Sequence, residues 1–169
     1  MEEVLAVVVH WDGGSPKSIK ALKRWMKENR PQFWYHRFIK GTEVDYGRST
    51  NERCIAAGHE KYTAEAVKFF GKYCPDWVHS EQTPHDNSPN NCCIHICILH
   101  DYPDGGYSPE TLFTAAKNCG EMLRAYNLGI EALETHSFIC GKDYKHCPKE
   151  FVEKPLQWEI FKDMVKHNI

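Results

Sequence analysis

The sequence predicts a single α/β domain, and two observations carry that prediction. The first is the length of 169 residues, which is the size of one domain and enough for a hydrophobic core without disulfide bonds. The second is the alternation of strand-like and helix-like segments along the chain, with no internal repeat and no linker between them. One domain over residues 1–169 is therefore expected.

The predicted strands rest on short runs of apolar and β-branched residues. Val4 to Val9 is a continuous run of this kind, which fits a buried strand that ends at His10. Cys93 to Leu99 predicts a second buried strand. Three further segments are predicted to be extended, the first two as a hairpin: 33–39, 43–46 and 131–136.

Helical periodicity predicts four helices, over 16–29, 64–73, 112–126 and 156–165. Ser15-Pro16 and Ser108-Pro109 each combine a favourable N-cap with proline at the first helical position. The predicted apolar faces of the first and last helices consist of Ile19, Leu22, Trp25 and Met26, and of Leu156, Ile160, Phe161 and Met164.

The least regular part of the chain is the segment 60–90. Its second half, from Ser80 to Asn91, is rich in serine, proline, asparagine and aspartate, which predicts a long loop. Long loops in compact domains are often functional. This segment is a candidate insertion, which either contributes to a substrate groove or lies on the surface without a role.

The composition excludes two classes of protein and raises one question. The formal net charge is −2, so there is no electrostatic case for nucleic-acid binding. The longest apolar run, Val4 to Val9, is too short to cross a bilayer, so no membrane insertion is expected.

The start of the chain lacks the pattern of a signal peptide, which predicts synthesis in a reducing cytoplasm. The feature that needs explaining is the surplus of 8 cysteines and 10 histidines.

Three of these residues lie where metal ligands are common, at strand ends and in adjoining loops. His10 follows the first predicted strand, His136 ends the last one, and Cys147 lies in the loop after it. Two imidazoles and one thiolate would make a tetrahedral zinc site with one open position, where a bound water becomes nucleophilic. Taken alone, the same placement also fits hydrogen-bonded histidines and a small buried cysteine.

The order of several short motifs resembles that of the type-2 N-acetylmuramoyl-L-alanine amidases, which include phage endolysins, autolysins and peptidoglycan-recognition proteins. The motifs that carry this resemblance span nearly the whole chain: the strand ending in His10, Trp34 to Ile39, Glu43 to Arg48, Ala57-Gly58-His59, Asn90 to Ile98, His136, Lys145 to Pro148, and Trp158 with Phe161. The Asn90 to Ile98 segment resembles the pattern Asn-x-x-Ser-Ile-Gly-Ile-Glu-Leu of that family.

The resemblance implies a central mixed sheet flanked by helices, and it implies roles for particular residues. His10, His136 and Cys147 match the zinc ligands of the family. Tyr35 matches a catalytic tyrosine near the metal, and Lys145 matches a lysine of the small phage amidases. Zinc, the tyrosine and the lysine would stabilise the oxyanion of amide hydrolysis.

The roles of several residues near the matched motifs do not follow from the family pattern alone, and alternatives stay open for the catalytic lysine and for the substrate cleft. Lys142 competes with Lys145 for the role of catalytic lysine, and His59 is a candidate residue of the substrate cleft. Cys97 stands where many relatives carry a glutamate, so the resemblance is greatest to the phage subgroup that depends on tyrosine and lysine. His36 and His95 lie within matched motifs and are expected to be structural.

The resemblance implies a zinc amidase that cuts the bond between N-acetylmuramic acid and L-alanine in bacterial peptidoglycan. The expected setting is a phage or prophage endolysin that is made in the cytoplasm and acts on the wall after release. No wall-binding domain is recognisable. One alternative is a non-catalytic peptidoglycan-binding module, against which the retained Cys147 speaks. Another is an unrelated α/β protein whose cysteines belong to the core.

Overall fold

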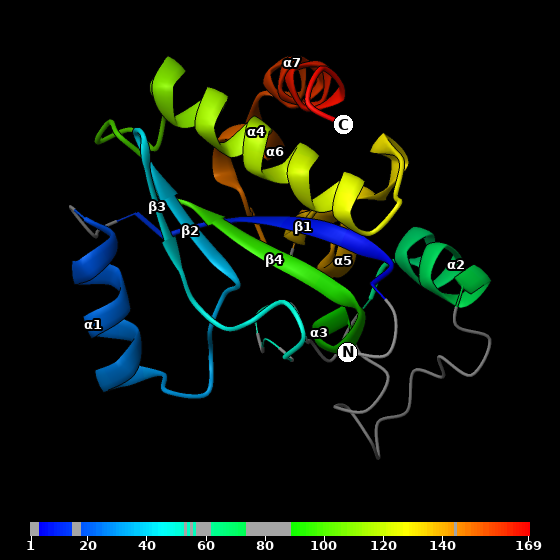
Figure 1. Ribbon diagram of the computed structural model, residues 1–169, viewed down its shortest axis with the longest axis horizontal. Helices are drawn as coiled ribbons and strands as arrows, with labels where there is room; N and C mark the ends of the chain where they lie inside the picture. The colour runs from blue at the N-terminus through cyan, green and yellow to red at the C-terminus, as the bar shows by residue number, and fades with distance from the viewer. Residues whose placement is uncertain are drawn as a thin grey trace.

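A mixed five-stranded sheet lies between two layers of helices in the computed structural model (Figure 1). The structure describes residues 4–14, 18–52, 54, 56, 62–73, 89–143 and 145–169. The strand order is β3-β2-β4-β1-β5. The strands are β1 (Ala6–Trp11), β2 (Arg37–Lys40), β3 (Glu43–Tyr46), β4 (Cys93–Ile98) and β5 (Leu133–Thr135).

Strand directions bring the ends of distant segments together. β1 is parallel to both of its neighbours, β4 and β5, and β2 is parallel to β4. Only the edge strand β3 runs antiparallel, paired with β2 in the predicted hairpin. Because parallel strands end at the same edge of a sheet, residues that follow β1, β4 and β5 are placed near one another.

One face of the sheet is covered by α4 (Pro109–Ala125) and α7 (Pro155–Lys166), which pack side by side (Figure 1). Alternate residues of β1 and β4 supply the apolar surface beneath them: Val7, Val9, Ile94, Ile96 and Ile98. α4 begins after the N-cap Ser108, whose side chain accepts a hydrogen bond from the Thr111 N–H, as its sequence predicts.

The opposite face is covered by α1 (Ile19–Asn29), α2 (Ala64–Tyr73) and α5 (His136–Cys140). The intervening residues of the strands face this side, and two apolar clusters fill it: Ala6, Val8 and Cys93 with Phe70 and Ile139, and Phe38 and Cys97 with Ile19, Leu22 and Met26. Two short helices complete the fold, α3 (Pro89–Cys92) and α6 (Lys149–Glu153).

Several predictions of local structure need correction. On α1, Trp25 is half exposed and does not join the buried face that Ile19 begins. On α7, Leu156 and Ile160 are exposed, whereas Phe161 and Val165 are buried and Trp158 and Met164 pack partly buried against the same cluster.

The predicted strand over 33–39 is shorter in the structure and begins only at Arg37. At this boundary the His36 N–H donates to the His95 carbonyl at 2.9 Å, while the His95 N–H donates to Nδ1 of the His36 ring at 2.9 Å. The ladder of paired residues begins one residue later, at Arg37. The predicted segment 131–136 is divided among a 3-10 turn (Ile130–Ala132), β5 and the start of α5.

The candidate insertion 60–90 is described only in part. α2 confirms the helix predicted over 64–73, and Pro89 and Asn90 are helical instead of part of a loop. Residues 74–88 lie outside the described residues, as does His59. No helix among the described residues is long and apolar enough to cross a membrane.

Candidate metal centre

The structure brings His10, His136 and Cys147 together at one edge of the sheet. His10 lies near the end of β1, His136 is the first residue of α5 directly after β5, and Cys147 lies just before α6. One donor atom from each residue lies within 4.8 Å of the other two, and all three residues are buried. Among the described parts of the chain, this is the only group of three or more His, Cys, Asp or Glu residues whose donor atoms lie close enough together to hold a metal ion.

The atoms of this group are arranged around the ring of His10. Its Nδ1 lies 3.9 Å from Sγ of Cys147, and its ring centroid lies 4.7 Å from that of His136. Two nitrogens and one sulfur form a donor set that suits zinc, and three protein ligands are the usual number in catalytic zinc sites. The residues present therefore fit the metal that the resemblance implies.

A single serine holds two members of the group in place. The Ser137 N–H donates to the Cys147 carbonyl at 2.9 Å, and the Cys147 N–H donates to Oγ of Ser137 at 2.8 Å. Since Ser137 directly follows His136, the loop that carries Cys147 is fixed to the helix that carries His136. Thr135 caps that helix, because its side chain accepts from the Phe138 N–H.

His10 is also in contact with a second histidine, His95 of β4. Nε2 of His10 lies 3.0 Å from Nδ1 of His95, and Nε2 of His95 lies 3.3 Å from the carbonyl oxygen of Pro89. His36 stacks on His95 with ring centroids 5.9 Å apart and planes 11° apart. His10, His36 and His95 are all buried, and sequence analysis had given His36 and His95 a structural role only.

Burial dominates the electrostatics of the site. It lowers the pKa of His10 well below its ordinary value, and the charges of His136, His95 and Lys145 lower that pKa further. Burial raises the pKa of the Cys147 thiol to about 12, against an opposing hydrogen bond from the backbone of Trp11 and the charge of Lys145. Both side chains are thus held neutral until a cation offers its own charge.

Tyr35 lies against the candidate ligands, as the resemblance implied. Its ring centroid is 5.1 Å from that of His10, and burial raises the pKa of its phenol well above the ordinary value. Its backbone is held by the hairpin end, where the Arg48 N–H donates to the Tyr35 carbonyl at 3.1 Å. Gly47 is required there, since a Cβ at that position would lie 1.8 Å from the same carbonyl oxygen.

The two candidate lysines differ in their relation to the site. Lys142 and Lys145 are both exposed, in the loop between α5 and α6. Lys145 is the one whose positive charge contributes to the lowered pKa of His10, after burial, His136 and His95. It also lowers the pKa of Cys147, which burial raises. The choice between Lys145 and Lys142 as the catalytic lysine stays a prediction.

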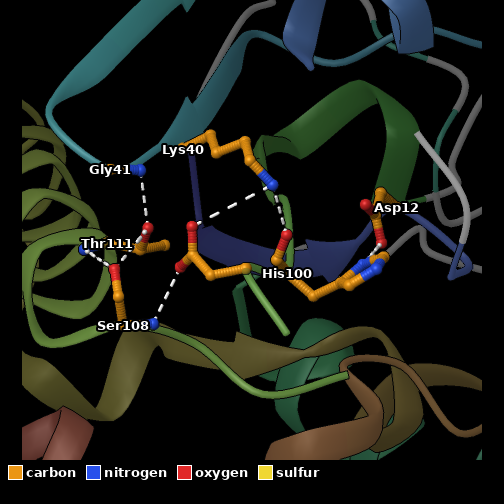
Figure 2. Close-up of polar contacts among 7 residues, drawn as sticks. Asp12, Lys40, Gly41, His100, Ser108 and Thr111 are labelled. Carbon is orange, nitrogen blue, oxygen red and sulfur yellow. Dashed lines mark hydrogen bonds and ion pairs between the residues drawn. The ribbon is translucent and has the colours of Figure 1, made fainter. Parts of the chain in front are cut away.

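A buried carboxylate beside the site was missed by the sequence analysis. The Asp12 side chain is fully buried, and its Oδ1 lies 2.6 Å from Nδ1 of His100 (Figure 2). Figure 2 also shows Lys40 reaching the His100 carbonyl, at 2.5 Å. The second carboxylate oxygen of Asp12 has no hydrogen-bond partner among the described residues. The signal that could have found it is its position directly after the strand that carries His10.

Cys97 stands beside His10 in the sheet, at the position where the family pattern has glutamate. The Cα atoms of the two residues are partners in the β1–β4 register, and Cys97 is fully buried. Burial raises the pKa of its thiol well above the ordinary value, and the charge of Asp12 raises it further. Cys97 therefore stays a neutral thiol and cannot take the place of a carboxylate base.

No family model and no curated protein matches the sequence. Solved structures do match over nearly its full length. The structure of PlyL has a TM-score of 0.69 at 16% identity, and the match covers 99% of this chain and 86% of that one. The Staphylococcus aureus hydrolase AmiA in complex with its ligand has a TM-score of 0.68 at 14% identity, covering 98% and 73%.

A third solved structure names an activity. The N-acetylmuramoyl-L-alanine amidase LysC from Clostridium intestinale has a TM-score of 0.54 at 13% identity, covering 92% of this chain and 86% of that one. Identities this low establish architecture only, which agrees with the mixed sheet and flanking helices that were expected. The resemblance to the type-2 amidases is therefore confirmed in the fold: this chain has the architecture of the amidase and endolysin structures that it matches.

Proposed function

We propose that this chain is a zinc-dependent N-acetylmuramoyl-L-alanine amidase, which hydrolyses the amide bond between N-acetylmuramic acid and L-alanine in bacterial peptidoglycan. The observation that carries the proposal is the convergence of buried donor atoms from His10, His136 and Cys147 within 4.8 Å. The shared architecture with a hydrolase and with an amidase supports it. The motifs that resemble the type-2 amidases include all three of these residues.

The proposed ligands of zinc are His10, His136 and Cys147. Their nitrogen and sulfur atoms match the preference of zinc, and three ligands leave a position open. When bound, zinc would supply the Lewis acidity that activates a water molecule and polarises the scissile carbonyl. Binding of zinc would release the proton of the Cys147 thiol to the solvent, because only the thiolate is a ligand. This release would work against burial, which raises the pKa of the thiol to about 12.

Tyr35 and Lys145 are the proposed catalytic residues. The phenol of Tyr35 keeps its proton, because burial raises its pKa, so it acts as a hydrogen-bond donor to the tetrahedral oxyanion. The ammonium group of Lys145 is exposed and brings positive charge to the same region. Together they stabilise negative charge that is greater in the transition state than in the substrate.

We further propose that the chain acts as one catalytic domain of an endolysin, made in the cytoplasm and acting on the wall. Bacterial peptidoglycan is the proposed partner, without nucleic acid and without membrane insertion. His59 is proposed to border the substrate, and the segment 60–90 either contributes to the same groove or is a surface insertion without a role. The second candidate function is a peptidoglycan-binding module without activity, which would use the same fold.

The deciding experiment is digestion of purified bacterial cell walls with identification of the new chain ends. The amidase proposal expects new N-terminal alanine without new reducing sugar. Removal of metal by a chelator should abolish the release, and added Zn²⁺ should restore it. New reducing ends alone would refute the proposal. Co-sedimentation with walls without any new ends would instead establish the binding module.

A further inference from the structure

Three buried groups form a chain of contacts that leads away from the proposed metal site. Nε2 of His10 lies 3.0 Å from Nδ1 of His95, and Nε2 of His95 lies 3.3 Å from the carbonyl oxygen of Pro89. The other nitrogen of the His10 ring, Nδ1, faces Sγ of Cys147 at 3.9 Å. His10 and His95 have no exposed surface, so water does not compete for these contacts.

The carbonyl of Pro89, at the end of this chain of contacts, determines which nitrogen donates in each hydrogen bond. A carbonyl oxygen only accepts, so Nε2 of His95 carries a hydrogen and donates to Pro89. A neutral imidazole has one N–H, which leaves Nδ1 of His95 as an acceptor. Nε2 of His10 must then be the donor in the contact between the two rings. The lone pair of His10 is thereby left on Nδ1, on the side of Cys147.

The environment supports neutral rings at both positions. Both rings are fully buried, and a charged imidazolium is costly without water or an opposite charge beside it. Among the described residues, the groups that these hydrogen bonds and ring contacts bring to the two rings are other rings, a thiol and a carbonyl, and none of them is a carboxylate.

We propose that His95 is a positioning residue that holds His10 as its Nε2–H tautomer, with the Nδ1 lone pair directed toward the metal site. A metal-bound histidine commonly donates its second ring nitrogen to an outer partner, which fixes the tautomer and the ring orientation. Here that partner is the acceptor nitrogen of His95. The inference rests on the proposed function, because it takes His10 to be a zinc ligand.

His95 is itself fixed from two sides. It lies on β4 near the centre of the sheet, and its backbone N–H donates to Nδ1 of His36 at 2.9 Å. Nε2 of His36 then donates to the carbonyl of Glu52 at 3.0 Å, and the two imidazoles stack.

The test compares three variants with the unmodified protein. His95→Leu removes the acceptor, and His95→Asn keeps an acceptor oxygen near the position of Nδ1. His167→Leu is the matched control, since His167 is on the surface of the C-terminal segment. Two quantities are measured: the Zn²⁺ affinity by competition with a chelator, and the tautomer of His10 by ¹⁵N NMR of the ring nitrogens before metal is added.

The expected result is an Nε2–H tautomer for His10 in the unmodified protein. Zn²⁺ affinity should fall about 10–100-fold in His95→Leu, as is typical for outer partners of metal ligands. It should recover to within a few-fold in His95→Asn and stay unchanged in His167→Leu. Circular dichroism confirms that each variant is folded.

Two results would overturn the inference. One is unchanged Zn²⁺ affinity in folded His95→Leu, and the other is an Nδ1–H tautomer of His10 in the unmodified protein. The NMR measurement needs no variant, so it decides the question even where His95→Leu fails to fold. Failure of the proposed function is distinct, because it means that the unmodified protein neither binds Zn²⁺ nor releases alanine, whatever the His10 tautomer.

Discussion

The two faces of the central sheet are built from the same strands and both pack against apolar clusters, but only one of them also holds the candidate site. Along β4, Ile94, Ile96 and Ile98 face α4 and α7 and form part of a purely apolar cluster. The residues between them, such as His95 and Cys97, face the other side. β1 shows the same contrast between Val7 and Val9 on one side and His10 on the other. Alternation along a strand thus separates the surface that stabilises the fold from the surface that holds the candidate site.

This difference teaches how a buried polar site is tolerated in a small domain. The apolar face supplies burial over the full width of the sheet, while the polar residues gather toward the ends of β1 and β5. On the polar face, hydrogen bonds between rings and carbonyls compensate the loss of water. Substitutions on one face should therefore change metal binding and activity, and substitutions on the other should change stability.

Cys147→Ser should have the largest effect. The hydroxyl is a poorer zinc donor than the thiolate, so Zn²⁺ affinity should fall by more than about 100-fold, beyond the cost of losing an outer partner. Alanine release from cell walls should fall to background at ordinary Zn²⁺ concentrations. Chelator competition and end-group analysis measure the two effects. Full activity of the variant would refute the ligand assignment.

Tyr35→Phe tests the polar face without touching a ligand. Removal of one oxyanion donor typically costs on the order of 10²–10³ in turnover. The rate of alanine release should fall by that factor, whereas Zn²⁺ affinity should stay within a few-fold of the original. A variant that retains its rate would show that the phenol only packs against His10.

Lys145→Met, with Lys142→Met as its matched control, decides between the two candidate lysines. Loss of the Lys145 charge should lower turnover by about 10²-fold, since a cation near the oxyanion disappears. Lys142→Met should leave turnover nearly unchanged. Wall digestion by the two variants at equal concentration measures the contrast. The reverse order of effects would assign the role to Lys142.

Ile96→Ala tests the apolar face. Ile96 is fully buried beneath α4, and truncation of such a residue costs about 2–5 kcal/mol of unfolding free energy. Urea unfolding measures this loss, and the Zn²⁺ affinity of the folded protein should stay within a few-fold. A large loss of affinity would mean that the two faces are coupled more strongly than their separation suggests.

Glu134→Gln tests the edge strand β5, where a half-buried carboxyl group lies two residues before the proposed ligand His136. Burial raises the pKa of Glu134 to about 7, against the opposing charge of Lys162. The folded protein therefore binds this proton more tightly than the unfolded chain. Its contribution to stability is greatest below the unfolded pKa of about 4.5 and is lost as the pH rises through about 7.

The glutamine variant should remove this pH dependence. At pH 8 it should be more stable than the unmodified protein by about 1–3 kcal/mol, because one pKa unit corresponds to about 1.4 kcal/mol. At pH 4 the two proteins should differ little. Thermal or urea unfolding at the two pH values measures the difference. Equal stability at pH 8 would show that Glu134 gains compensating contacts when it ionises.

The parts of the fold that follow local rules could be predicted from the sequence. The serine cap of α4, the hairpin of β2 and β3 and the buried run of β1 each have a signal within a few residues. His10 and His136 could be proposed as a pair because both lie near strand ends. Short helices such as α3 and α6 could not be predicted, since 4 and 5 residues are too few to show a helical period.

The parts of the site that depend on strand order could not be predicted from the residues alone. All six residues of β4 are buried, so hydropathy does not reveal that one side carries His95. Its contact with His10 exists only because β4 pairs with β1 in one register. The same holds for Asp12 and His100, which are 88 residues apart and follow those two strands.

The separation of 137 residues between His10 and Cys147 gives the candidate site a second consequence. A cation held by both would close most of the chain into one loop, much as a covalent cross-link does. Because the three donors are scattered in the unfolded chain, the ion would bind the folded form and would raise its stability by mass action. At a concentration 100 times the dissociation constant this gain is about 2.7 kcal/mol. The melting temperature of the protein would then rise with the concentration of the available metal ion.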